Sequence, residues 1–311
     1  MSIKNGVYVA LVTPFNKNNT ICWSSLEKLI NFHIEKNTTG LVLLGTTGEA
    51  PTLTYTEKTD IIDFVYKKAD KKIDIVVGVG GNNTEEVKQL AIYCQNKGVA
   101  DSLMVTVPNY NKPTQEGIYQ HFKQIADYVK LPIMMYNIPS RCGVNMTPET
   151  VEQIYGDCDN VVAIKEASGS LEQAIKIKSL CDINIFSGDD SLILPILAIG
   201  GVGVISVASN ILPWEISHIV SEFNNNIELS RKLYFKFHNF IKALFVTTNP
   251  VPVKYLLSKI DLINNDIVRL PLVKDNDLEV KMKGVEDFLK EYQMEKQAGG
   301  RVEPNKCPMV V

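Results

Sequence analysis

The chain has 311 residues, of which 45% are hydrophobic and 22% are charged, a composition typical of a folded globular protein. Its formal net charge of −3 argues against nucleic acid or an anionic membrane as a partner. No apolar run is long enough to cross a bilayer, and Met1-Ser2-Ile3-Lys4 does not open a signal peptide, so we expect a cytoplasmic protein.

The six cysteines and four histidines are dispersed along the chain. No two cysteines have the close spacing of metal ligands, and His33, His121 and His238 fall inside helix-like segments. We therefore predict no metal site, no histidine-based triad, and free thiols in a reducing compartment.

Short apolar runs alternate with segments of helical period through most of the chain. The runs are continuous rather than alternating, as in parallel strands that are buried on both faces. The sequence predicts eight such strands, at residues 8–12, 41–44, 73–79, 103–107, 132–136, 161–164, 183–186 and 202–207.

Helices are predicted between these strands. Ser24 or Ser25 is expected to cap the first, over residues 26–34, and Thr56 and Thr84 to open the next two. A further helix is expected over residues 115–129, and Thr147-Pro148 should cap a short one, since proline is tolerated at the first helical position.

Eight β/α units of this size predict a (β/α)8 barrel over residues 1–225. A doubly wound sheet is the competing topology, but the glycine-rich turn expected after its first strand is absent. Residues 226–296 carry helical patterns at 227–243, 250–259 and 278–292, which predicts a helical region on the barrel's flank. Residues 297–311 show no periodicity and are expected to be a disordered tail.

In such a barrel the active site lies at the C-terminal ends of the strands. The residues that the predicted strands deliver there are Thr46 and Thr47 (second), Tyr110 (fourth), Tyr136 and Arg141 (fifth), Lys165 (sixth), Gly188 (seventh) and Ile205 (eighth).

Lys165 ends a buried run, where desolvation disfavours its charged form. A neutral lysine amine captures a carbonyl substrate as an imine, which then serves as an electron sink. Tyrosine hydroxyls can shuttle the protons that imine formation needs. The backbone and hydroxyls of Gly45-Thr46-Thr47-Gly48 suit a carboxylate, as does the fork of Arg141.

Each of these residues also has an ordinary structural explanation. Lys165 could extend to water, Tyr136 could cap the core, and Arg141 could form a surface ion pair. The Gly-Thr-Thr-Gly run could be only a tight turn. Their predicted convergence on one rim of the barrel favours chemistry over these separate explanations.

Three motifs resemble the dihydrodipicolinate synthase family of pyruvate-dependent class I aldolases. They are Gly45-Thr46-Thr47-Gly48-Glu49, Tyr136-Asn137-Ile138-Pro139-Ser140-Arg141 and Ile164-Lys165-Glu166-Ala167-Ser168. The resemblance runs from Gly6 to about Tyr292 and includes the Asn249-Pro250-Val251-Pro252-Val253-Lys254 segment and a second tyrosine loop around Tyr110.

The resemblance implies condensation of pyruvate with L-aspartate 4-semialdehyde to 4-hydroxy-tetrahydrodipicolinate, on the diaminopimelate route to lysine. It implies no metal or organic cofactor, and a homotetramer built as a dimer of dimers. Lys165 would form the Schiff base. Tyr136 would exchange protons beside it, with Thr46 and the Tyr110 of a neighbouring subunit completing a relay.

The resemblance also assigns the substrate-binding residues. Thr47 and the backbone at Ile205 would hold the pyruvate carboxylate, Gly188 would line the pocket, and Arg141 would receive the semialdehyde carboxylate. The alternative is an N-acetylneuraminate or 2-keto-3-deoxy-sugar-acid aldolase that uses the same Lys165, although a sugar tail does not call for a carboxylate clamp such as Arg141.

Relatives inhibited by lysine bind it with side chains that this chain replaces by Tyr55, Lys58 and Asn109, while Asn82 and Glu86 match. Lys58 would place a cation beside an incoming lysine. We therefore expect weak or absent inhibition by lysine.

Overall fold

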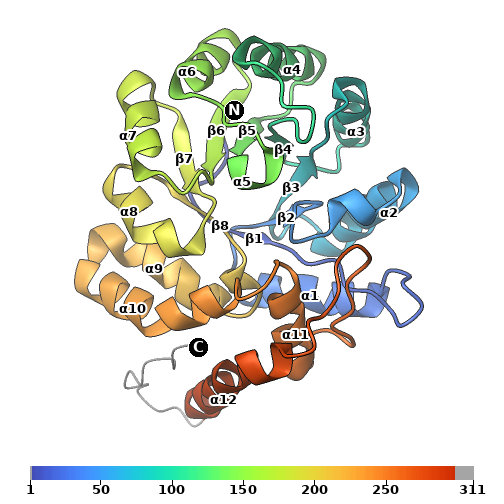
Figure 1. The fold of residues 1–311 in the computed structure, drawn as a ribbon, viewed down its shortest axis with the longest axis vertical. Helices are drawn as coiled ribbons and strands as arrows, with labels where there is room; N and C mark the ends of the chain where they lie inside the picture. Colours follow the sequence, from blue (N-terminus) through green and yellow to red (C-terminus); the bar gives the residue numbers. More distant parts are fainter. Residues whose placement is uncertain (1, 298–311) are drawn as a thin grey trace.

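A computed structural model describes residues 2–297 of the chain. Eight parallel strands form a closed barrel in sequence order, and β1 and β8 pair to complete the ring (Figure 1). The strands are β1 (Gly6–Ala10), β2 (Gly40–Leu43), β3 (Asp74–Val79), β4 (Ser102–Thr106), β5 (Ile133–Asn137), β6 (Val161–Glu166), β7 (Asn184–Ser187) and β8 (Gly203–Ser206).

The predicted (β/α)8 barrel is therefore confirmed, and the strand bounds differ from the predicted runs by at most two residues at either end. Every residue of β2, β5 and β8 is buried. Continuous apolar runs reveal such strands because helices cover the outer face of the barrel while side chains fill its interior.

Helices surround the strands in Figure 1. Those up to residue 198 are α1 (Trp23–Glu35), α2 (Tyr55–Ala69), α3 (Thr84–Lys97), α4 (Gln115–Tyr128), α5 (Pro139–Cys142), α6 (Pro148–Asp157), α7 (Leu171–Leu180) and α8 (Ile193–Ala198). Single 3-10 turns lie at η1 (Ala50–Thr52), η2 (Asp190–Leu192) and η3 (Ala208–Asn210).

The predicted start of α1 is wrong, because the helix begins at Trp23 and Cys22 occupies the N-cap position. Ser25 is buried inside the helix, and its hydroxyl accepts a hydrogen bond from the backbone N–H of Asn264 at 3.0 Å. That serine therefore joins the first helix to the C-terminal region, a role that local sequence does not encode.

The sequence predicts that α2 opens at Thr56, but in the structure it starts one residue earlier. The helix begins at Tyr55, and Thr54 caps it in a reciprocal capping box with Glu57. Thr147 caps α6 as predicted, with Pro148 at its first position.

The seam between β1 and β8 closes the barrel. Gly6 and Gly203 face each other there, and a Cβ atom at Gly203 would lie 2.0 Å from the carbonyl oxygen of Gly6. The seam therefore requires glycine at position 203.

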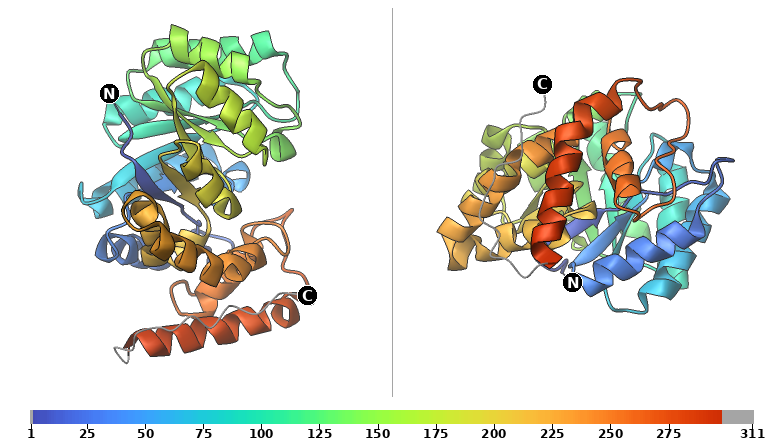
Figure 2. Two further views of the ribbon diagram at one scale, coloured as in Figure 1. Left: turned by 90° about the vertical axis from the view of Figure 1, so that its left-hand side faces the viewer. Right: turned by 90° about the horizontal axis from the view of Figure 1, so that it is seen from below.

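The chain after the barrel is helical, with α9 (Pro213–Asn225), α10 (Ile227–Ala243), α11 (Val251–Lys259) and α12 (Leu278–Gln297). In Figure 2 α12 lies along one end of the molecule, and it contacts α10 and α11. Phe237 of α10 packs against Tyr292 of α12 with ring centroids 5.2 Å apart. The predicted division at residue 226 stays a prediction, and the tail predicted at 297–311 lies, apart from Gln297, outside the described residues.

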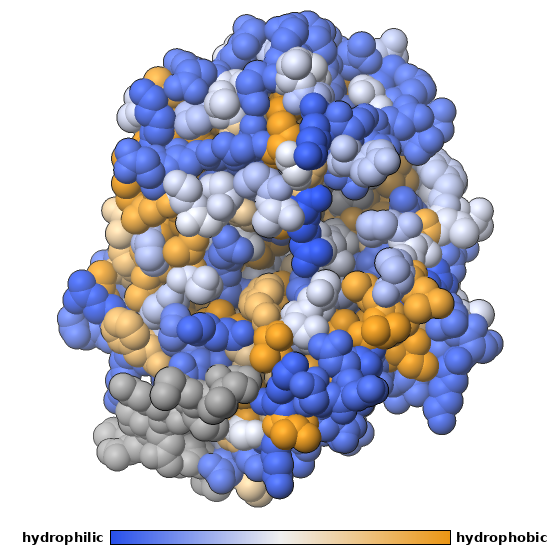
Figure 3. Space-filling model, in the orientation of Figure 1, coloured by the Kyte–Doolittle hydropathy of each residue, from blue (hydrophilic) through white to orange (hydrophobic). Residues whose placement is uncertain are grey.

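Hydrophilic residues dominate the face shown in Figure 3, with hydrophobic residues in separate patches. Within residues 2–297, no helix has the length and apolar character needed to span a membrane.

Candidate active site

Lys165 lies near the C-terminal end of β6 and is only 6% exposed. Its register partner on β5 is Tyr136, and the Lys165 Nζ lies 3.8 Å from the centroid of the tyrosine ring. The lysine therefore does not extend to bulk water, and the amine and the phenol share one buried space.

Burial lowers the pKa of Lys165 to about 8, because desolvation penalises the ammonium form. The carboxylates of Asp189 and Asp190 act in the opposite direction, and the guanidinium of Arg141 adds to the lowering. At pH 7 about a tenth of the molecules then carry a neutral Lys165 amine, which is nucleophilic.

Tyr136 is buried, and desolvation raises its pKa above the usual range for a phenol. A hydrogen bond with the Thr46 side chain and the charge of Arg141 act in the opposite direction. Tyr136 therefore keeps its proton at neutral pH, and the bond to Thr46 ties the loop after β2 to β5.

The loop at residues 45–49, hereafter the threonine loop, is tightly closed on itself. The backbone N–H of Gly48 donates to the carbonyl of Gly45 at 3.1 Å, and that of Glu49 donates to the carbonyl of Thr46 at 3.0 Å. Glu49 has a φ of +53°, and Thr47 is 3% exposed. The tight-turn explanation of this sequence is therefore correct, and the turn also places both threonines at the barrel rim.

Three contacts from residues after the barrel hold this loop, and sequence reasoning missed them. The Asn249 Nδ2 donates to the Thr47 Oγ1 at 3.0 Å. Lys254 and Glu49 form an ion pair in which both side chains are buried, and the backbone N–H of Arg269 donates to the Glu49 Oε2 at 2.9 Å.

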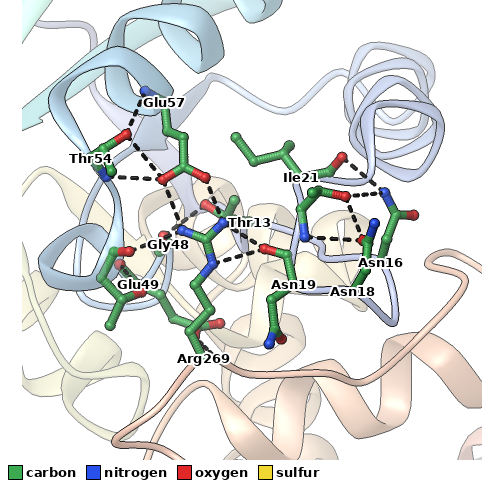
Figure 4. Close-up of polar contacts among 12 residues, drawn as sticks. Thr13, Asn16, Asn18, Asn19, Ile21, Gly48, Glu49, Thr54, Glu57 and Arg269 are labelled. Atoms are coloured by element: carbon green, nitrogen blue, oxygen red, sulfur yellow. Dashed lines mark hydrogen bonds and ion pairs between the residues drawn. The ribbon is translucent and has the colours of Figure 1, made fainter.

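The Arg269 side chain extends this connection along the outside of the loop, as Figure 4 shows. Its guanidinium pairs with Glu57 of α2 and donates to the carbonyl oxygens of Asn19 and Thr52. The Asn249-to-Lys254 segment stands out in the sequence, but nothing in that segment indicates that it contacts residues near position 50.

Gly188 follows β7, and its backbone N–H donates to the carbonyl of Glu166 at 2.8 Å. A Cβ atom at Gly188 would lie 2.5 Å from the Ala167 Cβ, so only glycine fits at this point of the rim. Ile205 is buried in β8 and pairs with Tyr8 of β1.

Two carboxylates next to the predicted residues were also missed. The Asp190 Oδ2 accepts the backbone N–H groups of Val207 and Ala208 at 2.9 and 3.2 Å, which fixes the chain after β8. Glu166 is buried beside Lys165, and its Oε2 accepts the Asn137 Nδ2 at 3.1 Å. The signal for Glu166 was its position directly after Lys165 in the third motif, just beyond the apolar run.

Arg141 lies on the short helix α5 and is exposed. Its charge lowers the pKa of both Lys165 and Tyr136, so it lies within electrostatic reach of the buried pair. The structure thus brings Thr46, Tyr136, Lys165 and Arg141 together, with the arginine on the solvent side.

Tyr110 is placed differently, since it is 86% exposed and has a φ of +70°. Its backbone N–H donates to the carbonyl of Cys142 at 3.2 Å, and within residues 2–297 the structure records no contact between Tyr110 and Tyr136 or Lys165. In the single subunit the Tyr110 side chain is thus exposed, whereas Tyr136 and Lys165 are buried.

The position predicted to repel lysine lies on α2. Tyr55 is exposed, and burial lowers the pKa of Lys58, with Glu86 acting in the opposite direction. Weak inhibition by lysine stays a prediction.

The chain resembles known proteins over nearly its whole length. The model of the dihydrodipicolinate synthetase family matches residues 4–290. The chain belongs to this family. The 4-hydroxy-tetrahydrodipicolinate synthase of Methanococcus aeolicus is 42% identical to it over 288 residues, which cover 92% of this chain and 98% of that protein.

Two solved structures show the same relationship. The 4-hydroxy-tetrahydrodipicolinate synthase of Methylacidiphilum fumariolicum SolV has a TM-score of 0.89 at 36% identity, with 95% of this chain and 98% of that chain covered. The chloride-inhibited dihydrodipicolinate synthase of Acinetobacter baumannii, solved in complex with pyruvate, has a TM-score of 0.85 at 37% identity, with 95% and 99% covered.

Proposed function

We propose that this family member condenses pyruvate with L-aspartate 4-semialdehyde to give 4-hydroxy-tetrahydrodipicolinate. The observation that carries the proposal is the buried Lys165 amine, with its pKa lowered to about 8, 3.8 Å from the Tyr136 ring. The pyruvate complex of the Acinetobacter baumannii relative supports the choice of ketoacid.

In the proposed mechanism the neutral Lys165 amine attacks C2 of pyruvate to give a carbinolamine, which loses water to form an imine. Tyr136 donates and accepts the protons of these steps, and Thr46 orients its hydroxyl. Loss of a proton from C3 gives an enamine, and its C3 attacks the aldehyde carbon of the second substrate. The amino group of that substrate then displaces Lys165 and closes the ring.

The substrate carboxylates divide between two places on the rim. Thr47 and the backbone at Ile205 would hold the carboxylate of pyruvate, and Gly188, which has no side chain, would leave room for this substrate. Arg141 would receive that of the semialdehyde, for which its exposed position at the open side is suited.

We further propose a cytoplasmic homotetramer, a dimer of dimers in which the exposed Tyr110 completes the neighbouring subunit's site.

Borohydride reduction in the presence of pyruvate tests the imine directly. A reduced adduct should be found by peptide mass spectrometry on Lys165 and should be absent from Lys165→Ala. Lys254 is an internal control, because it is also buried with a pKa lowered to about 8 but is paired with Glu49. An adduct on Lys254, or none on Lys165, would refute the proposal.

Arg141→Ala distinguishes the proposed second substrate from a sugar acid. The variant should raise the KM for the semialdehyde by about tenfold or more and lower kcat, because an interaction with a charged group is lost, while the pyruvate KM changes little. Arg231→Ala, at an exposed arginine of α10, is the matched control. Faster turnover of N-acetylneuraminate or a 2-keto-3-deoxy-sugar acid would favour the alternative aldolase.

A further inference from the structure

Asn249 and Thr47 form a buried hydrogen-bonded pair between the chain after α10 and the threonine loop. The two residues are 6% and 3% exposed, and the bond runs from the Asn249 Nδ2 to the Thr47 Oγ1 at 3.0 Å. Buried polar groups in proteins are almost always hydrogen-bonded. Which of these two groups donates therefore decides what the threonine loop can offer to a ligand.

An amide nitrogen only donates, whereas a hydroxyl has one proton to donate and two lone pairs to accept. Thr47 therefore accepts from Asn249 and keeps its own proton for another partner. Within residues 2–297 the structure records no other hydrogen bond for this hydroxyl. The pair thus presents an O–H donor at the barrel rim, the polarity that a carboxylate requires.

A second contact joins the same two segments. Lys254, just beyond Asn249 on α11, pairs with Glu49 at the end of the threonine loop, and the carboxylate also accepts the backbone N–H of Arg269. Lys254 additionally donates to the carbonyl of Ile267 at 2.8 Å. The loop is thus held at Thr47 and again at Glu49 (Figure 4 shows Glu49 and Arg269).

We propose that Asn249 is a positioning residue for the ketoacid: it orients the Thr47 hydroxyl as a donor to the pyruvate carboxylate. The inference rests on the proposed function, because it takes pyruvate as the ligand of Thr47. It adds a residue of the C-terminal region to the determinants of ketoacid affinity.

The test is a double-mutant cycle on pyruvate affinity. Asn249→Ala should raise the pyruvate KM about fivefold, within the effect of losing one hydrogen bond, while the semialdehyde KM stays near that of the wild type. Thr47→Val should raise the pyruvate KM at least as much. The double variant should be no worse than Thr47→Val alone, because Asn249 acts only through that hydroxyl. Asn225→Ala, at an exposed asparagine of α9, is the control.

The pyruvate concentration that gives half-maximal borohydride trapping on Lys165 is a second measure, and it does not depend on how much of a variant is folded. Asn249→Asp, which is isosteric but lacks the amide donor, should shift it as Asn249→Ala does. An unchanged value in Asn249→Ala, additive effects in the double variant, wild-type affinity in Asn249→Asp, or an equal rise in the semialdehyde KM would each overturn the inference. Failure of wild-type Lys165 to trap pyruvate would instead overturn the proposed function.

Discussion

Two buried lysines in this structure show how the same pKa arises in different settings. Burial lowers the pKa of Lys165 and of Lys254 to about 8. Lys254 touches the Glu49 carboxylate, whereas the described residues give Lys165 no ion pair and only the more distant charges of Asp189 and Asp190. Only Lys165 can lose its proton without leaving a buried carboxylate unpaired.

The pKa of Lys165 predicts a pH dependence for imine formation. At low pyruvate, the rate of borohydride trapping should rise about tenfold per pH unit below pH 8 and level off above it, because only the neutral amine attacks. Tyr136 does not add a second transition in this range, since burial raises its pKa. The measurement is the initial trapping rate across a buffer series.

Asp189→Asn provides the comparison for that profile. The Asp189 carboxylate raises the pKa of Lys165, so its removal should move the rise to lower pH. A profile that is flat below pH 8, or one that Asp189→Asn moves to higher pH, would contradict the assignment of the nucleophile.

At the scale of elements, the chain around α11 holds the threonine loop as well as covering the barrel. The chain from Asn249 to Arg269 contacts the threonine loop and the start of α2. The hydrogen bond from Arg269, the capping bonds of Thr54 and the charge of Arg269 lower the pKa of Glu57 to about 2, so this ion pair persists at mildly acidic pH.

Lys254→Ala should therefore destabilise the protein by about 3 kcal/mol, since it leaves the Glu49 charge buried without its partner. Urea unfolding followed by circular dichroism measures the change. Lys259→Ala, at an exposed lysine on the same helix, should cost less than about 0.5 kcal/mol. Equal midpoints for the two variants would show that the buried pair contributes little.

The strands and most of the predicted rim residues could be inferred from sequence because both signals are local. Apolar runs mark the strands, and the residues near the end of each run or in the loop that follows it are expected at the rim. The contacts of Asn249 and Arg269 could not, since their partners lie about 200 residues earlier and nothing in either segment encodes the pairing. The start of α1 was missed for the same reason, because the Ser25 hydroxyl serves Asn264.

At the scale of the whole molecule, the exposed Tyr110 is the residue through which we propose that two subunits share a site. Its side chain is 86% exposed on a backbone with positive φ, whereas Tyr136 is buried against Lys165 and Thr46 and Arg141 interact with that pair. A large aromatic side chain held away from its own barrel suits insertion into a second copy of the chain.

Mixing two impaired variants tests this sharing. Lys165→Ala and Tyr110→Phe should each have low activity, but hybrid dimers contain one site with an intact Lys165 and an intact neighbouring Tyr110. Equal amounts refolded together should regain about a quarter of the wild-type activity, since half of the dimers are hybrids with one intact site of two. Lys165→Ala mixed with Tyr136→Phe should regain none, because both groups belong to one subunit. Recovery in the control, or none in the test, would place Tyr110 elsewhere.

The seam at Gly6 and Gly203 bears on synthesis by the ribosome. The first strand has no partner on that side until the eighth has emerged, and the donor to Thr47 emerges later still, at Asn249. A nascent chain arrested between these two points can close its ring of strands yet still lack the amide that orients Thr47. Acquisition of full ketoacid affinity is thereby deferred until the last quarter of translation.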